Sequence, residues 1–578
     1  MISPQPTRAI AEPVSRSRLT DLAVMAAGLA LFYGVLSIGR TWFNPAEPDA
    51  GISLSPSALP VYAAYSLLRI GVAYVISLGF AVAYGYAAAY NEKAERIMLP
   101  ALDILQSIPV LSFLPSVMMA MAALFPHSRA GLELGSIVLI FTGQTWNIAF
   151  SFYSSVKSIP NDLKEAARIN RFSFWQRFLQ LELPYSSIGL VWNSMMSVAG
   201  GWFFLMVCEM FPLGDRQIRL PGLGSYLQTA ANDGNVPAIL WGLATMVSIV
   251  VLLDLLVWRP VIVWADKFKF EEVESGAAPA SAVLNVLRRS TVLSSVNRRA
   301  LAPLGERITM IFAERDDKSQ SVRSPKSKVW TERFITALVL IAVAYGVYKA
   351  GALLTGATRA DFGEIGRGAV ATFLRVGAAL VLGSAWTIPA GVLIGFSPRL
   401  AKIAQPLAQI AASIPATGLF PVVLLLLLSA HLVTPGGGLG TASLLLMLLG
   451  TQWYILFNVI AGAMAIPTDL KEAARVFGFS LTERWRFLII PGIFPYLITG
   501  LVTAAGGAWN ASIVAEYMPF QGQILTTTGL GATIAASFNN YPRLLAATVV
   551  MAGLVVTINR LVWRRLYRLA QTRFKLET

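Results

Sequence analysis

Long apolar segments dominate this chain and restrict it to folds that a lipid bilayer can hold. A hydrocarbon core about 30 Å thick is crossed by roughly 20 apolar residues in a helix. Only 13% of the 578 residues are charged, whereas soluble chains carry about 25%. We therefore predict an all-α polytopic membrane protein of about twelve transmembrane helices. The segments lie near 20–39, 62–90, 97–125, 131–156, 185–212, 236–264, 333–355, 369–397, 402–430, 440–463, 490–517 and 544–563.

The distribution of positive charge predicts the orientation of these helices. With the N-terminus inside, 22 Lys and Arg residues fall on the cytoplasmic side and 10 on the other, leaving the central linker out. An excess of Lys and Arg in cytoplasmic loops is the rule for membrane proteins. The sequence thus predicts that both termini are cytoplasmic. This topology accounts for the net charge of +15, which therefore does not indicate nucleic-acid binding.

The chain contains the same pattern twice, about 307 residues apart. "GQTWNIAF" at 143–150 corresponds to "GTQWYILF" at 450–457, and "GLG" at 222–224 to "GLG" at 529–531. Six spans return the chain to its starting side, so the two copies are parallel repeats, and substrate paths tend to lie where such repeats meet. We predict a first half at 1–264, a polar cytoplasmic linker at 265–332 and a second half at 333–578.

Two polar islands, near 160–183 and 467–490, interrupt the apolar pattern on the predicted cytoplasmic side. Each begins with an acid in a capping position, Asp162 or Asp469, continues with "KEAAR", and contains a second capping box at Ser173 or Ser480. Each therefore predicts two short helices at the membrane surface. A solvated surface helix would explain one such island, but two matched copies favour a docking surface for a partner.

The islands carry a resemblance to a known family. "EAARVFG" at 472–478 with "LIIP" at 488–491, and "EAARINR" at 165–171 with "LELP" at 181–184, resemble the EAA motif of permease subunits of bacterial ABC importers. "EYMPF" at 516–520 and "EMFPLG" at 209–214 are similar to the nitrate/sulfonate/taurine branch. Family permeases usually carry one such half per chain, whereas this chain carries both. The coupling residues that the resemblance implies are Asp162, Glu165, Ala166, Ala167, Arg168, Asp469, Glu472, Ala473, Ala474, Arg475 and Gly478.

The resemblance also implies partners and a place in the cell. It implies the type I ABC importer permease fold in the bacterial inner membrane, two copies of a separate ATPase on the islands, a periplasmic binding protein, and a small anionic solute such as nitrate, a sulfonate, taurine or bicarbonate. The chain contains no "GxxxxGK[ST]". We therefore expect a permease subunit and not an enzyme, with no cofactor of its own and with ATP and Mg²⁺ bound by the partner.

One residue departs from the motif. The second island has Gly478 where the motif expects glycine, but the first has Arg171. A left-handed backbone costs a non-glycine residue about 1–2 kcal/mol. We therefore expect the first island to turn differently from the second.

The membrane path is expected where prolines break the spans and where charges approach the membrane. A proline inside a helix removes a backbone hydrogen bond, and broken backbone at membrane depth is tolerated around a water-filled cavity. A packing kink, headgroup contact or a structural ion pair would explain the same residues. The candidates are Ser107, Pro109, Ser413, Pro415, Thr417, Arg69, Arg375, Glu209 and Glu516.

Two other classes of protein remain as alternatives. An ion-coupled secondary transporter is also commonly built from repeats, and a channel could use the same spans. Neither alternative explains the two matched islands.

Overall fold

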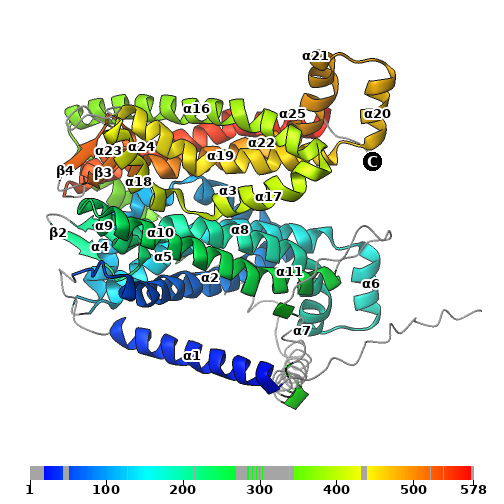
Figure 1. The fold of residues 1–578 in the computed structure, drawn as a ribbon, viewed down its shortest axis with the longest axis horizontal. Coiled ribbons are helices and arrows are strands. Elements are labelled where there is room, and N and C mark those ends of the chain that lie inside the picture. The colour runs from blue at the N-terminus through cyan, green and yellow to red at the C-terminus, as the bar shows by residue number, and fades with distance from the viewer. Residues whose placement is uncertain are drawn as a thin grey trace, which may run out of the picture. The chain divides into compact units, whose positions relative to one another are not determined.

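The computed structural model describes most of both halves. Figure 1 shows the chain as a ribbon. Residues 333–336 of the predicted seventh span, nearly all of the predicted linker and the glycine run at 434–438 lie outside the described residues. The described ranges are 18–42, 51–126, 128–213, 216–268, 344–430, 439–520, 523–537 and 539–573, with scattered positions between 283 and 341.

The fold is helical, and its elements occur twice in the same order, as the repeat predicted. An α-helix forms its backbone hydrogen bonds within itself, and it therefore suits a bilayer core, where no water is present to bond the backbone groups. The corresponding pairs are α2 (Leu59–Tyr90) and α16 (Arg359–Phe396), α3 (Glu92–Ser107) and α17 (Pro398–Ser413), α4 (Leu114–Leu124) and α18 (Ala416–Ser429), α5 (Ala130–Ser158) and α19 (Gly440–Ala465), α8 (Leu183–Glu209) and α22 (Ile490–Ala515), α9 (Leu223–Asn232) and α23 (Leu530–Ala536), and α10 (Val236–Leu253) and α24 (Tyr541–Ile558).

Seven of the described helices are long and apolar enough to cross a membrane, and eight if one bent pair counts as a single span. The bent pair is α3 with η2 (Val110–Phe113) and α4, which differ in direction by 84°. Pro109 lies at this break, as the sequence predicted from its missing amide. The remaining predicted spans include α1 (Arg18–Trp42), α5 and the 14-residue α18, so the total of twelve stays a prediction.

The chain divides into two compact units that do not coincide with the two halves. The smaller unit comprises residues 1–42, 150–195 and 251–339, and it contains α6 (Asn161–Ile169), α7 (Phe174–Arg177), η3 (Phe178–Glu182) and α11 (Arg259–Ala265). The larger unit comprises residues 43–149, 196–250 and 340–578. It therefore holds nearly all of the second half, from residue 340 onward, together with part of the first.

The core of the larger unit lies between α16, α19 and α22, which run side by side in Figure 1. Ile455, Val459 and Ile493 are fully buried in it. A Cβ at Gly391 would lie 2.7 Å from Val459, and one at Gly395 would lie 2.7 Å from Ala463. Because small residues let helix backbones approach closely in membranes, these two glycines on α16 explain its tight contact with α19.

A short β-hairpin follows the long fifth span of each half. β1 (Met210–Leu213) pairs with β2 (Arg216–Arg219), and β3 (Tyr517–Phe520) pairs with β4 (Gln523–Thr526), both antiparallel and in the same register. In the larger unit, the β3–β4 hairpin lies at one end of α22, whereas α20 (Thr468–Val476) and α21 (Leu481–Glu483) lie at the other end (Figure 1).

Candidate functional site

The two islands have closely matched local structures. α6 and α20 both begin after a proline, Pro160 or Pro467, and both are nine residues long. Ser173 and Ser480 then form the predicted capping boxes with Gln176 and Glu483. Each island continues into its long span through a π-helical turn, η3 in the first and η7 (Arg484–Ile489) in the second, a feature that is frequent at functional sites.

The prediction that Asp162 and Asp469 cap these helices is wrong. Each acid lies inside the first turn, and the cap position is held by the preceding proline, which makes no side-chain cap bond. Proline fixes its own φ near −65° and so starts the turn earlier than the acid would. The carboxylates are still favourable there, because negative charge near a helix N-terminus is stabilised by the unpaired amides.

The expectation that the first island turns differently is also wrong. Arg171 adopts φ 50°, close to φ 68° at Gly478. The amides of Asn170, Arg171 and Phe172 donate to the carbonyls of Ala166, Arg168 and Ala167, as the three corresponding amides do in the second island. These three hydrogen bonds thus impose the same turn on both islands, and Arg171 adopts the left-handed backbone despite its conformational cost.

The Arg171→Gly variant should therefore be more stable than the natural chain, by about 1 kcal/mol. Arg171 is exposed, so the substitution removes little packing. The thermal midpoint of the purified chain in detergent measures the effect. Gly478→Arg is the matched reverse change and should lower the midpoint by a similar amount; a lower midpoint for Arg171→Gly would contradict this account of the turn.

The outer surface of each island combines acids with exposed apolar side chains. Ala167 and Ala474 are buried and anchor the helices, whereas Glu165 and Glu472 are exposed. Ile169 is 79% exposed, and Val476 at the corresponding position is 83% exposed. Phe477 and Leu481 extend this exposed apolar surface in the second island. Exposing several apolar side chains to water at one place is unfavourable. A contiguous exposed apolar surface of this kind is typical of an interaction site.

In each half, a buried ion pair joins an arginine of the second span to the glutamate that directly precedes the hairpin. In the first clamp (Ser66, Arg69, Glu133 and Glu209), Arg69 lies on α2 and is completely buried. Its guanidinium contacts Glu133 at 2.5 and 2.8 Å, Glu209 at 2.8 Å and the carbonyl of Pro221 at 2.9 Å. The Ser66 hydroxyl donates to Glu209 at 2.5 Å.

The second clamp (Thr372, Arg375, Glu516 and Thr527) repeats this plan with one acid fewer. Arg375 contacts Glu516 at 2.8 Å and the Thr527 hydroxyl at 2.9 Å, and Thr372 donates to Glu516 at 2.8 Å. The position that corresponds to Glu133 at the repeat spacing is Gly440. Consistent with this loss, the Arg375 side chain is 17% exposed, whereas that of Arg69 is not exposed at all.

The clamps explain the repeated "GLG" that follows each hairpin. The amide of Gly224 donates to Glu209 at 2.6 Å, and that of Gly531 donates to Glu516 at 2.9 Å. A Cβ at Gly222 would lie 2.2 Å from the carboxyl carbon of Glu209. The corresponding Cβ at Gly529 would meet Glu516 in the same way. Only glycine therefore leaves room for the carboxylate that holds the hairpin.

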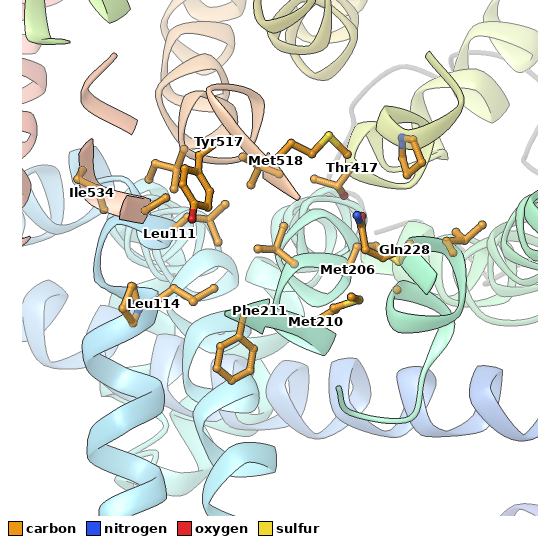
Figure 2. Close-up of a pocket in the computed structure, with 18 residues that line it drawn as sticks. Leu111, Leu114, Met206, Met210, Phe211, Gln228, Thr417, Tyr517, Met518 and Ile534 are labelled. Carbon is orange, nitrogen blue, oxygen red and sulfur yellow. The ribbon is translucent and has the colours of Figure 1, made fainter. Parts of the chain in front are cut away.

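A cavity of about 120 Å³ lies within the larger unit (Figure 2). It is lined by residues of η2, α4, α8, α9, α18, α22 and α23 and of the first strands of both hairpins. Sixteen of its eighteen lining residues form pairs related by the repeat spacing. These pairs are Leu111 and Thr417, Pro115 and Pro421, Met206 and Ile513, Val207 and Val514, Met210 and Tyr517, Phe211 and Met518, Leu227 and Ile534, and Gln228 and Ala535.

The predicted path residues are distributed between the cavity, the clamps and the breaks. Thr417 lines the cavity, and Pro109 and Pro415 cap the helical segments that begin at its wall. Ser107 and Ser413 end α3 and α17. The two arginine–glutamate pairs form the clamps and do not line the cavity. The sequence reasoning missed Glu133, Gln228 and Tyr517; the repeat comparison could have flagged the last two as polar residues with apolar counterparts.

A duplicated bundle with clamped hairpins at one end of the fifth span and short exposed helices at the other defines a polytopic membrane permease. The family described as "Binding-protein-dependent transport system inner membrane component" matches residues 76–258 and 387–575, once in each half. The chain belongs to this family and contains two of its domains.

Three curated relatives are each named as a permease for one solute. The nitrate import permease NrtB of Synechococcus elongatus is 29% identical over 26% of this chain and 50% of its own length. The taurine transport permease TauC of Escherichia coli is 27% identical over 32% and 61%, and the bicarbonate transport permease CmpB of Synechocystis is 28% identical over 33% and 61%. The matched region thus spans between half and about three fifths of these relatives.

Proposed function

We propose that this chain forms the complete membrane path of an ATP-driven ABC importer in the bacterial inner membrane, with both termini in the cytoplasm. Two copies of a separate ATPase bind the islands and hold ATP and Mg²⁺. A periplasmic binding protein delivers solute to the hairpin side. The observation that carries the proposal is the pair of matched islands, each with an exposed acid beside exposed apolar side chains.

The transport cycle follows from the arrangement of these parts. ATP binding closes the two ATPases and pulls on both islands, and each island continues into its long span through a π-helical turn. The far ends of these spans carry the clamped hairpins, so a tilt of α8 and α22 moves the hairpins and opens or closes the cavity between the repeats. Release of the solute follows hydrolysis.

The solute that this proposal assigns is a small anion. Nitrate, taurine and bicarbonate appear in the names of three relatives, each of which is 27–29% identical to this chain over the matched region.

An ion-driven carrier is a weaker account of the same structure. Such a carrier needs a carboxylate that binds and releases a coupling ion. Glu209 and Glu516 are each held by an arginine, a hydroxyl and a backbone amide. That geometry suits a permanent structural role.

Reconstitution tests the proposal. The chain is placed in liposomes with a candidate ABC ATPase subunit, with a candidate binding protein outside, and uptake of radiolabelled nitrate, taurine and bicarbonate is measured. We expect uptake of at least one of them that requires ATP and the ATPase. Uptake driven by an ion gradient in the absence of ATP would overturn the proposal.

A further inference from the structure

A basic helix follows the last span of the second half, away from the cavity lining and the clamps. α24, the π-helical turn η8 (Asn559–Trp563) and α25 (Arg564–Arg573) form one continuous helical stretch. Figure 1 shows α25 in red, toward the end of the larger unit where α20 and α21 lie. Four of the ten residues of α25 are arginines and none is acidic. All four are exposed: Arg564, Arg565, Arg568 and Arg573.

One face of α25 packs on the protein, and the opposite face carries positive charge. The Tyr567 hydroxyl donates to that of Thr499 on α22 at 3.3 Å, and Ala570 is buried. Arg565 and Arg568 each lie two residues before one of these contacts, which is about 200° around a helix of 3.6 residues per turn. The two arginines therefore lie on the face of α25 that is opposite to α22.

The exposed residues before α25 show where this face lies relative to the bilayer. Leu561 and Val562 are exposed and apolar, so in a membrane protein they contact lipid chains. A helix rises by 1.5 Å per residue, so Arg565 and Arg568 lie about 4.5 and 9 Å beyond Val562, and Arg573 lies about 16 Å beyond it. The headgroup layer is roughly 5–8 Å thick on each side of the hydrocarbon core. Since long basic side chains adjust their depth, Arg565 and Arg568 reach this layer, and Arg573 lies past it.

The positive charges of this face are only partly balanced within the described part of the chain. There, the acid that pairs with α25 is Asp103 on α3, which lies 3.1 Å from Arg564. Arg565 and Arg568 are three residues apart and are therefore neighbours on the helix surface, where like charges are destabilising. Two guanidinium groups at this spacing can hold one phosphate through charge-assisted hydrogen bonds. An anion from outside the chain therefore stabilises this face.

The repeat shows that the two arginines are not needed to form the helix. Alignment of "LVW" at 256–258 with "LVW" at 561–563 places Pro260 and Val263 at the positions of the two arginines. The structure has a π-helical turn followed by a helix in both copies. The general excess of basic residues at membrane ends favours such residues in either copy, so it does not account for a pair that is present in one copy alone.

We propose that Arg565 and Arg568 bind the phosphate head of one anionic phospholipid of the surrounding bilayer. The head lies between the two guanidinium groups, and the lipid chains lie along the exposed apolar surface of Leu561 and Val562. Because α25 packs against α22, this contact also holds the adjoining part of α22 at the membrane surface. The inference goes beyond the proposed function and does not rest on it, since it requires a membrane protein and the basic face of α25.

The test titrates the full chain in detergent with phosphatidylglycerol and with phosphatidylcholine of the same acyl chains, and native mass spectrometry measures the affinity for each lipid. One basic residue near the surface of an anionic membrane changes affinity roughly fivefold. We therefore expect phosphatidylglycerol to bind about 25-fold more tightly than phosphatidylcholine. Equal affinity for the two lipids would overturn the inference.

Inorganic phosphate distinguishes a lipid site from a site for a free anion. Millimolar phosphate should not displace phosphatidylglycerol, because phosphate has no acyl chains that hold it at the level of Arg565 and Arg568. Displacement of the lipid by phosphate would assign these arginines to a soluble anion and would also overturn the inference.

Variants then locate the site on α25. Arg565→Gln and Arg568→Gln should each weaken the binding of phosphatidylglycerol roughly fivefold and leave that of phosphatidylcholine unchanged. Arg573→Gln is the matched control, because it removes the same charge from the same helix beyond the headgroup layer, and it should change neither affinity. An unchanged preference for phosphatidylglycerol in the double glutamine variant, or an equal loss in Arg573→Gln, would refute the assignment. The comparison of the two lipids uses the natural chain, so it decides the matter even if a variant fails to fold.

Discussion

The Arg69→Met variant is expected to lose about 3–5 kcal/mol of unfolding free energy. Methionine keeps much of the volume of the side chain but removes the positive charge that two buried carboxylates share. Glu133 and Glu209 are 2% and 0% exposed, so neither can recover its hydration while the hairpin stays in place. Removing one partner from a buried ion pair is costly because the remaining charge is left uncompensated.

The second clamp supplies the matched control. Arg375→Met leaves one carboxylate, Glu516, which keeps the hydroxyl of Thr372 and the amide of Gly531. Arg375 is also 17% exposed and is therefore less completely buried than Arg69. We therefore expect a smaller drop in the thermal midpoint for Arg375→Met than for Arg69→Met. Adding Glu133→Gln to Arg69→Met should recover part of the loss, since it removes one of the two stranded charges. Equal losses in the two arginine variants would contradict the asymmetry of the clamps.

The repeat made much of this fold predictable. Paired positions identified the islands, the proline breaks and the glycines after each hairpin, because each of these features depends on a local backbone requirement that both copies share. Each capping box, at Ser173 and at Ser480, is specified by a pattern of four consecutive residues, and the structure confirms both. The first helix of each island began earlier than predicted because a proline, and not the acid, sets its start.

The parts that escaped prediction are those that only tertiary structure creates. Glu133 lies 64 residues from Arg69 and has no acidic counterpart in the second copy, so neither spacing nor repetition singles it out. Arg69 and Arg375 were expected to attract substrate or to reach the headgroups, and in the structure they bind acids inside the protein. The cavity forms only when hairpins and helices from both copies meet. The sequence does show which paired cavity positions differ in polarity, such as the polar Tyr517 at the position that corresponds to the apolar Met210.

The Glu472→Lys variant is expected to fold normally but to reduce ATP-dependent transport at least tenfold. Glu472 is exposed on α20 beside the apolar surface of Val476 and Phe477, so its reversal disturbs little inside the protein. At a docked interface, however, like charges placed together cost several kcal/mol. We expect the ATPase to remain active but to lose its coupling to uptake, measured as solute transported per ATP hydrolysed in liposomes.

Two further variants show whether the effect belongs to the islands. Glu165→Lys changes the corresponding acid of the first island, and because the two turns are alike it should reduce transport to a similar extent; the double variant should abolish it. Glu92→Lys reverses an exposed acid on α3, outside both islands, and should leave transport unchanged. Normal coupling in the double variant would refute docking at these helices, whereas a loss in Glu92→Lys of equal size would assign the effect to surface charge in general. A selective loss in the island variants places the transmission of force at the EAA helices, which continue directly into α8 and α22, the spans that reach the cavity.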